Sequence, residues 1–247
     1  MEVFDRIEKN TIEGKKQLAI LIDPDKSTRA SLRETASIAG QSGADYLFVG
    51  GSLLTRDNMK LCIDELKSVC GLPVIIFPGN ILQVVDNADA LLLLSLISGR
   101  NPEMLIGNHV VAAPLIRNSG LEVIPTGYIL VESGKITSVL YMSNTLPIPF
   151  DKTDIAVCTA MAGEMLGLQL IFMDAGSGAI QNIPMEMVRA VRQNIQVPLV
   201  VGGGIRTPEA ALEVWDAGAD VVVIGNAAET HPDVILEMGE ARKAINE

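Results

Sequence analysis

VPLVVGGGIRTPEAALEVWDAGADVVVIGN, residues 197–226, contains two apolar segments that each end in glycine and flank one predicted helix. The first segment, residues 197–201, is rich in valine and fits a strand that is buried on both faces. Thr207 is a good N-cap and Pro208 suits the first helical position, so a helix is expected to start here and to run to about residue 217. The second strand is expected at residues 219–224. A strand, a helix and a strand in this order fit one repeat of a (β/α)8 barrel, also called a TIM barrel.

Glycines follow both strands of this repeat. Gly203, Gly204 and Gly225 lack a Cβ, so the backbone there can approach an anion closely, and Asn226 comes next. Backbone amides at the two strand ends and at the N-terminus of the next helix would surround a phosphate group with donors. The same glycines are compatible with tight turns that bind nothing. Because two glycine-ended strands one repeat apart match the phosphate site after strands 7 and 8 of such barrels, we expect a phosphate site.

Length and composition narrow the class of protein. The 247 residues have the usual size of one (β/α)8 barrel, so a single domain is expected over residues 1–247. A net charge of −11 and an isoelectric point near 4.7 argue against a nucleic-acid partner, and a phosphorylated substrate would need local donors or a metal ion. The three cysteines lack metal-ligand spacing, and neither a secretion signal nor a membrane-spanning run is present, so a cytoplasmic protein is expected.

The other elements continue the alternation of strands and helices. Residues 2–12 predict a short amphipathic helix, which we expect to cover the end of the barrel opposite the active site. Further strands are expected at residues 17–22, 44–49, 73–77, 88–94 and 169–173, and further helices at about residues 28–41, 101–117 and 153–166.

The fifth strand is the least regular part of the pattern. It is expected to begin at Glu122, but Pro125 and Gly127 argue against a simple central strand. Beyond a glycine turn, residues 136–141 suggest a hairpin-like extension of this strand. Residues 143–150 resemble a mobile lid or a substrate rim.

Two aspartates follow the first strand. Asp23 and Asp25 are two residues apart, so in an extended segment their side chains point the same way and could share one cation or one proton. Aspartates at strand ends also serve as turn and cap residues. Asp25 is the better ligand candidate, because Asp23 lies closer to the strand and can orient the loop. Ser52, after the second strand, offers an oxygen to a metal or a phosphate, or only a turn into the next helix.

A third aspartate, Asp174, follows the sixth strand and begins the sequence Asp-Ala-Gly-Ser-Gly. A carboxylate at a strand end beside such a loop places a candidate general base next to backbone and hydroxyl donors. Strands six, seven and eight are neighbours in a (β/α)8 barrel, so their loops would form phosphate-binding loops around one pocket with Asp174 at its edge.

Seven short motifs give the chain a family resemblance. They are LIDPDK (21–26), VGGS (49–52), FPGN (77–80), IPTGYIL (124–130), FMDAGSGA (172–179), VGGGIR (201–206) and IGN (224–226). With these motifs in this order, nearly all of the chain resembles the geranylgeranylglyceryl phosphate synthase family, which includes the heptaprenylglyceryl phosphate synthases of the PcrB type. The chain is most similar to the second of the two groups in that family.

The resemblance implies a Mg²⁺-dependent transfer of a prenyl group from an isoprenyl diphosphate, with geranylgeranyl diphosphate expected, to the 3-hydroxyl of sn-glycerol 1-phosphate. An ether bond forms, diphosphate leaves, and the product is destined for the membrane. It implies that Asp25 and Ser52 bind Mg²⁺ and the diphosphate, that Asp174 is the catalytic base and that Tyr128 lies along the prenyl groove. A homo-oligomer is also implied. Glycerol phosphate would be held by Phe172, Met173, Asp174, Ala175, Gly176, Ser177, Gly178, Gly203, Gly204, Gly225 and Asn226.

The chain departs from this family at one motif, because the family commonly has Tyr-Leu-Glu where this chain has Phe172-Met173-Asp174. Phe172 lacks the phenolic hydroxyl and Asp174 is one methylene shorter, so a base role requires a deeper substrate or an intervening water. Two other functions would share the fold: a phosphosugar isomerase or lyase, and a barrel that only binds prenyl or glycerol phosphates. An isomerase or lyase would usually need an acid and base pair or a Schiff-base lysine at the rim, where only Lys26 follows a strand.

Overall fold

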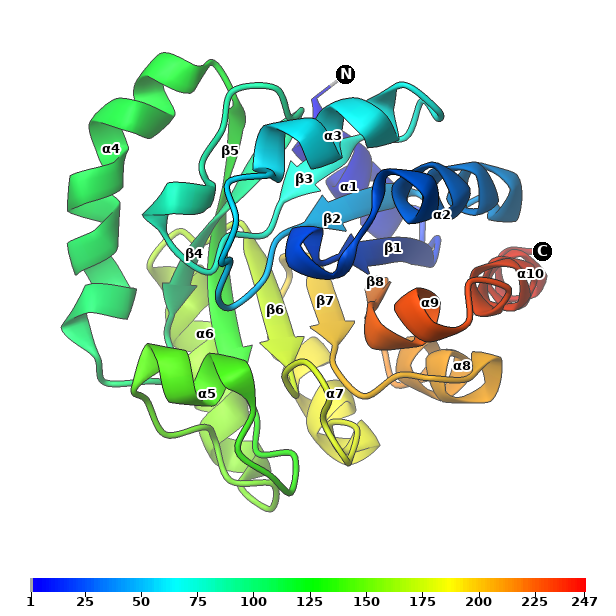
Figure 1. Cartoon of the computed structure of the whole chain (residues 1–247). Coiled ribbons are helices and arrows are strands. Elements are labelled where there is room, and N and C mark those ends of the chain that lie inside the picture. Colours follow the sequence, from blue (N-terminus) through cyan, green and yellow to red (C-terminus); the bar gives the residue numbers. More distant parts are fainter. Residues whose placement is uncertain (1) are drawn as a thin grey trace.

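Eight parallel strands close into a barrel in chain order in the computed structural model, which describes residues 2–247 (Figure 1). Strand β8 pairs with β1 and completes the circle. The expected (β/α)8 architecture is therefore confirmed. The strands are β1 Gln17–Ile22, β2 Tyr46–Val49, β3 Val74–Ile76, β4 Ala90–Leu96, β5 Glu122–Leu130, β6 Leu170–Asp174, β7 Leu199–Gly202 and β8 Val221–Ile224.

Helices surround the barrel (Figure 1). No helix within residues 2–247 is long and apolar enough to cross a membrane. The α-helices are α1 Val3–Ile12, α2 Arg29–Ser42, α3 Met59–Lys67, α4 Asn108–Ser119, α5 Ser138–Ser143, α6 Thr153–Met165, α7 Met185–Arg192, α8 Pro208–Asp216, α9 Asn226–Thr230 and α10 Val234–Asn246. Shorter helical segments are η1 Pro24–Lys26, η2 Ile81–Gln83 and the π-helix η3 Glu103–Gly107.

Local sequence explains where the helices begin. The Thr207 side chain accepts a hydrogen bond from the backbone N–H of Ala210, and Pro208 occupies the first turn of α8, as the sequence predicts. Thr28 caps α2 in the same way and exchanges hydrogen bonds with Ser31. These caps satisfy amide groups that a helix leaves unpaired at its N-terminus.

Helix α1 covers the end of the barrel at which the strands begin. The carboxylate of Glu122, the first residue of β5, accepts hydrogen bonds from the backbone N–H groups of Val3 at 2.5 Å and Phe4 at 2.7 Å. Val3 and Ile7 are buried against the side chains inside the barrel. This confirms the predicted role of the N-terminal helix and leaves the opposite end of the barrel to the loops.

Four aromatic rings fill the upper interior of the barrel. Phe77 and Phe172 stack with ring centroids 5.0 Å apart, and Tyr128 lies edge-on to both rings at 5.8 and 5.7 Å. Phe48 lies 6.4 Å from Phe77 and from Phe172. This cluster is a rigid floor beneath the loops that follow the strands.

Strand β5 is an unbroken nine-residue central strand, so the expectation drawn from its proline and glycine was wrong. Pro125 lies one residue before the pairing of β5 with β6 begins, where no N–H is needed for the ladder. Its carbonyl still accepts a hydrogen bond from Gln169 at 2.8 Å. Gly127 makes room for neighbours, because a Cβ there would lie 2.8 Å from the side chain of Ile171 and 2.9 Å from that of Ile97.

The predicted hairpin over residues 136–141 is also wrong, because this stretch enters helix α5. The segment before α5 instead runs beside the loop that follows β6, where the carbonyl of Ser133 accepts hydrogen bonds from Ile180 and Gln181. Within residues 143–150, Ile148 is buried, and its backbone donates a hydrogen bond to Leu130 at the end of β5 and accepts one from Glu132, two residues later. The segment is thus fastened to the barrel at its middle.

Candidate active site

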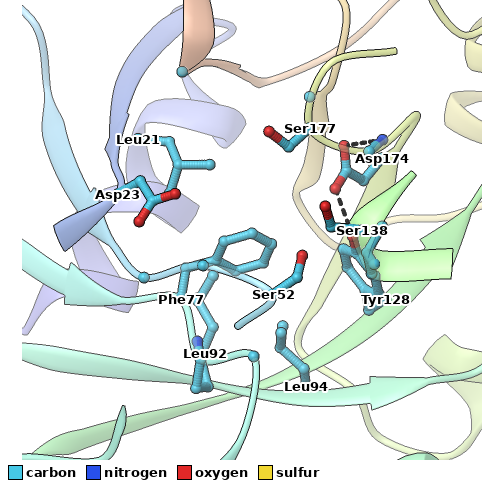
Figure 2. Close-up of a pocket in the computed structure, with 18 of the residues that line it drawn as sticks. Leu21, Asp23, Ser52, Phe77, Leu92, Leu94, Tyr128, Ser138, Asp174 and Ser177 are labelled. Carbon is cyan, nitrogen blue, oxygen red and sulfur yellow. Dashed lines mark hydrogen bonds between the residues drawn. The ribbon is translucent and has the colours of Figure 1, made fainter. Parts of the chain in front are cut away.

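A cavity of about 600 Å³ opens at the end of the barrel where the strands terminate (Figure 2). Its polar side is formed by the loops after β1, β2, β6, β7 and β8, and its apolar side by β4 and α4. Twelve of the predicted site residues line it: Asp25, Ser52, Tyr128, Phe172, Asp174, Gly176, Ser177, Gly178, Gly203, Gly204, Gly225 and Asn226. Met173 and Ala175 are buried in the cluster between strands and helices, because side chains alternate along β6. Their backbone alone can serve this cavity.

The glycines after β6 and β7 form a cradle that side chains would fill. Gly203 has a φ of +83°, and a Cβ there would lie 2.6 Å from Oδ1 of Asp174 and 2.7 Å from the backbone nitrogen of Ala175. Gly176 and Gly178 also have positive φ, at +87° and +74°. Both the backbone conformation and the close approach therefore require glycine. The result is a stretch of backbone free of side chains, which an anion can approach closely.

The loops after β6 and β8 are joined across this cradle. The hydroxyl of Ser177 donates a hydrogen bond to Oδ1 of Asn226 at 3.0 Å. This bond fixes the amide group of Asn226 so that its Nδ2 faces the space above Gly178, 3.7 Å from the point that a Cβ on Gly178 would occupy. A donor is thus presented to the cradle from β8.

Asp174 lies beside the cradle and is almost fully buried. Oδ1 accepts a hydrogen bond from the backbone N–H of Gly176 at 2.7 Å, and Oδ2 accepts one from the hydroxyl of Tyr128 at 2.5 Å (Figure 2). Burial raises the pKa of Asp174, while the two hydrogen bonds oppose that rise. Burial and the neighbouring carboxylate raise the pKa of Tyr128, so its hydroxyl stays protonated as a donor. Tyr128 and Gly176 thus hold the carboxylate of Asp174 in one orientation, and burial increases its basicity.

The hydroxyl contact of Tyr128 is a feature that the sequence reasoning missed. Its ring lies in the cavity wall, edge-on to the stacked rings of Phe77 and Phe172. The alternation of side chains along strands was a signal for this contact. It places Tyr128 and Asp174, on adjacent strands, at positions that both face the barrel interior. The register pairs Tyr128 with Phe172 and Leu130 with Asp174.

Asp25 lies in the loop after β1. Its Oδ2 accepts hydrogen bonds from the backbone N–H of Thr55 at 2.5 Å and from the Thr55 hydroxyl at 2.9 Å. The backbone hydrogen bond from Thr55 lowers the pKa of Asp25, so the carboxylate is ionised at neutral pH. Its Oδ1 is buried and has no hydrogen-bond partner within the described chain, residues 2–247. This oxygen is suited to a ligand that the protein itself does not supply.

Asp23 has a different environment from Asp25. Its Oδ1 accepts a hydrogen bond from the backbone N–H of Asp25 at 3.1 Å, and its Oδ2 lies 3.2 Å from the ammonium group of Lys26. Lys26 also pairs with Glu229 at 3.3 Å, on the helix after β8. Asp23 therefore shapes the loop, and the two aspartates do not share one role.

Ser52 reaches the cavity from the loop after β2, and its hydroxyl is directed toward the space between Phe77 and Ser138 (Figure 2). This loop is held by the fully buried side chain of Gln83, which donates to the carbonyl of Gly51 at 2.6 Å and accepts from its N–H at 3.3 Å. Gln83 also accepts from Gly79, so it joins the loops after β2 and β3. No pattern in the sequence signals this contact.

The oxygen atoms of Asp25 and Ser52 are hard donors on this side of the cavity. No group of three or more His, Cys, Asp or Glu side chains suited to a metal ion occurs among residues 2–247. A hard divalent cation held here would take further oxygen ligands from its substrate, as Mg²⁺ commonly does at phosphate sites.

The apolar side of the cavity reaches both faces of β4. It is lined by leucines that point into the barrel and by leucines that point toward α4, together with Met104, Ala112 and Ile116. His109 lies in this wall, where Nε2 is 3.2 Å from the Ser95 hydroxyl and burial lowers the pKa of the ring. His109 is therefore a packed neutral histidine. The apolar side of the cavity forms an apolar branch that is suited to a hydrocarbon chain.

Comparison with known proteins gives concordant results. The model of the PcrB family matches residues 10–242. Geranylgeranylglyceryl phosphate synthases of Chitinophaga pinensis and Spirosoma linguale are 51% and 48% identical to the chain, over 93% and 96% of it and over 91% and 95% of their own lengths. A crystal structure of (S)-3-O-geranylgeranylglyceryl phosphate synthase from Thermoplasma acidophilum, in complex with its substrate sn-glycerol-1-phosphate, superimposes with a TM-score of 0.93 at 33% identity, covering 99% of each chain.

Proposed function

The chain belongs to the PcrB family, and from this membership and the shape of its cavity we propose that it is a prenyltransferase that acts on sn-glycerol 1-phosphate. The reaction forms an ether bond between the 3-hydroxyl of glycerol phosphate and an isoprenyl group, for which geranylgeranyl is expected, and releases diphosphate. One observation carries the proposal: a glycine cradle, a buried carboxylate and an apolar branch lie within a single cavity. These are the parts that a phosphate ester, a reacting hydroxyl and a prenyl chain require.

Glycerol phosphate binds in the cradle. Its phosphate faces the backbone amides near Gly176, Gly178 and Gly203, where no Cβ obstructs its approach. Nδ2 of Asn226, which the Ser177 hydroxyl holds in place, adds a donor at the rim. Held in this way, the glycerol moiety extends toward the carboxylate at the inner edge of the cradle.

Asp174 accepts the proton of the glycerol 3-hydroxyl. As the allylic carbon loses its bond to the diphosphate oxygen, the hydroxyl oxygen forms the new carbon–oxygen bond and its proton passes to the carboxylate of Asp174. Tyr128 and Gly176 keep the carboxylate in place by donating to its two oxygens. The buried position excludes water, which would compete with the hydroxyl for the allylic carbon.

The diphosphate binds across the cavity near Asp25 and Ser52, and we propose that these residues hold Mg²⁺. The fit rests on Oδ1 of Asp25, a buried carboxylate oxygen with no partner within residues 2–247, and on the hard oxygen character of both side chains. When bound, Mg²⁺ would neutralise charge on the leaving diphosphate. Thr55 keeps Asp25 in position through two hydrogen bonds.

An assay with several substrates tests this function. The protein is incubated with labelled sn-glycerol 1-phosphate, Mg²⁺ and prenyl diphosphates of different lengths, and the extract is analysed for ether lipid. Ether product with a preferred prenyl length is the expected result. Binding of glycerol phosphate without product would indicate a barrel that only binds its ligand, and neither binding nor product would favour an isomerase or lyase.

Replacing Asp25 tests the metal assignment. In Asp25→Asn the charge of the unpartnered oxygen is lost, so we expect the Mg²⁺ concentration for half-maximal turnover to rise at least about tenfold. Binding of Mn²⁺, measured directly by electron paramagnetic resonance in the presence of diphosphate, should weaken in parallel. Asp57→Asn removes the same charge from an exposed position in the loop after β2 and should change neither value. An unaltered metal requirement in Asp25→Asn would refute the assignment.

Replacing Tyr128 tests the control of basicity at Asp174. Burial raises the pKa of Asp174, and the hydrogen bond from Tyr128 lowers it by favouring the ionised form. Tyr128→Phe removes that bond, so the pKa of Asp174 should rise further and the acidic limb of the kcat/KM profile should move to higher pH. At neutral pH turnover should fall about tenfold or more. Tyr46→Phe is the control, since it removes a buried hydroxyl that donates to Gln17 at 2.6 Å, away from the cavity. An acidic limb that stays in place or moves to lower pH in Tyr128→Phe would contradict the prediction.

A further inference from the structure

The segment that leads into α5 runs alongside the cradle loop after β6. The carbonyl of Ser133 accepts hydrogen bonds from Ile180 at 3.3 Å and Gln181 at 3.4 Å. Four residues later in the segment, Oγ1 of Thr137 lies 2.7 Å from the point that a Cβ on Gly176 would occupy. The two segments therefore run in opposite directions, in close contact over their whole length, and the residues between these contacts face the middle of the cradle loop.

Lys135 lies midway along this segment and extends over Gly178. Its Nζ is 3.2 Å, and its Cε 3.8 Å, from the position of a Cβ on Gly178. Nδ2 of Asn226 lies 3.7 Å from the same position. An ammonium group and an amide nitrogen are both donors only, so neither satisfies the other. Two side-chain donors thus lie close to the same side of Gly178, and an oxygen of an anion bound beside them could accept from both.

The charge balance at the cavity favours this arrangement. Lys26 is neutralised by Asp23 and Glu229, whereas Arg206, which lines the cavity, keeps its charge and is oriented by a hydrogen bond to the carbonyl of Ala179. Lys135 forms no ion pair with a carboxylate of residues 2–247, and the nearest ion-paired lysine along the chain is Lys152, which pairs with Asp151. In a chain of net charge −11, a phosphate needs a local cation of this kind.

We propose that Lys135 binds the phosphate group of glycerol phosphate at the rim of the cradle, beside Gly178. The identity of the phosphate ester rests on the proposed function, whereas the anion contact rests on the geometry around Gly178 alone. A charge-assisted hydrogen bond from Lys135 adds affinity for the doubly charged phosphate and none for the glycerol moiety. The lysine reaches the cradle from the segment between β5 and α5, whereas the glycines of the cradle belong to the loops after β6 and β7.

Direct binding tests the proposal. Lys135→Met keeps most of the apolar stem and removes the charge, and we expect calorimetry with sn-glycerol 1-phosphate to show a Kd about tenfold higher than for the unaltered chain. Inorganic phosphate should lose affinity by a similar factor. Lys135→Arg, which keeps the charge, should bind within about threefold of the unaltered chain. Lys152→Met removes the same charge from an exposed pair farther along the chain and is the matched control.

Steady-state kinetics show which substrate the lysine serves. In Lys135→Met the KM for glycerol phosphate should rise about tenfold, while the KM for the prenyl diphosphate and kcat stay within about twofold. An unchanged Kd, an equal loss in Lys152→Met, or a rise confined to the prenyl diphosphate KM would each overturn the proposal. If the unaltered chain formed no ether product, the proposed function would fail, but the comparison of Kd values would still decide the role of Lys135.

Discussion

Asp174→Asn is expected to lower kcat by about a thousandfold, in the range typical of a lost general base, while the Kd for sn-glycerol 1-phosphate changes little. The amide side chain has the same size and can still accept from the N–H of Gly176, so the cradle keeps its shape. It cannot take up the hydroxyl proton at neutral pH. Single-turnover measurements at saturating substrates separate this chemical step from product release.

Two comparisons make this result specific to the carboxylate. Asp174→Glu retains an ionisable group and has the length common in the family, so it should keep kcat within about tenfold of the unaltered chain. Calorimetry on Asp174→Asn should show glycerol phosphate bound with near-normal affinity. Turnover near the normal rate in Asp174→Asn would remove the residue from the mechanism, whatever the binding data show.

Gly203→Ala should produce the largest loss of substrate binding. The added Cβ would lie 2.6 Å from Oδ1 of Asp174, 2.7 Å from the backbone nitrogen of Ala175 and 2.8 Å from that of Gly176. Two of these are backbone atoms, so the loop after β6 must shift, and its amides leave the phosphate. We expect the Kd for sn-glycerol 1-phosphate to rise about a hundredfold, with a loss of two or more phosphate contacts. Isothermal calorimetry measures this effect.

A second glycine separates crowding from backbone strain. Gly203 has a positive φ of +83°, and a left-handed alanine costs about 1–2 kcal/mol of folding free energy. Gly14 has a similar φ of +71°, but no atom lies within 4 Å of the place that its Cβ would occupy. Gly14→Ala should therefore lower the free energy of unfolding by about 1–2 kcal/mol, through backbone strain alone, and leave the Kd unchanged. Equal affinity losses in both variants would contradict the explanation by crowding.

The sequence predicted the parts of the fold that repeat. Strands with continuous apolar residues, ended by glycine and followed by a capped helix, carry enough local information to specify a (β/α)8 barrel. Pro125 misled the prediction because its consequence depends on register, and the register places it just before the pairing with β6 begins. Residues 136–141 have a β-branched, apolar composition that favours a strand, yet α5 forms there after Thr137. Tertiary contacts of Thr137 with the cradle loop outweigh local propensity at that point.

The candidate site was predictable in position but only partly in detail. Asp25, Ser52 and Asp174 follow parallel strands, and the ends of such strands meet at one face, so their convergence on one cavity followed from topology. The buried amide of Gln83 and the ammonium of Lys135 are positioned by irregular loops. Their contacts depend on the path of those loops in three dimensions, which periodicity and residue spacing do not describe.

The attachment of α1 to Glu122 has a practical consequence for immobilised assays. Because the helix is fixed beneath the barrel by two hydrogen bonds, an affinity tag fused ahead of Val3 would emerge on the side away from the cavity. A sensor surface that captures the protein through such a tag leaves the cavity facing the solution. Phosphate esters and detergent-dispersed prenyl diphosphates can then be passed over one captured sample in turn, which allows the order of substrate addition to be measured without labelled compounds.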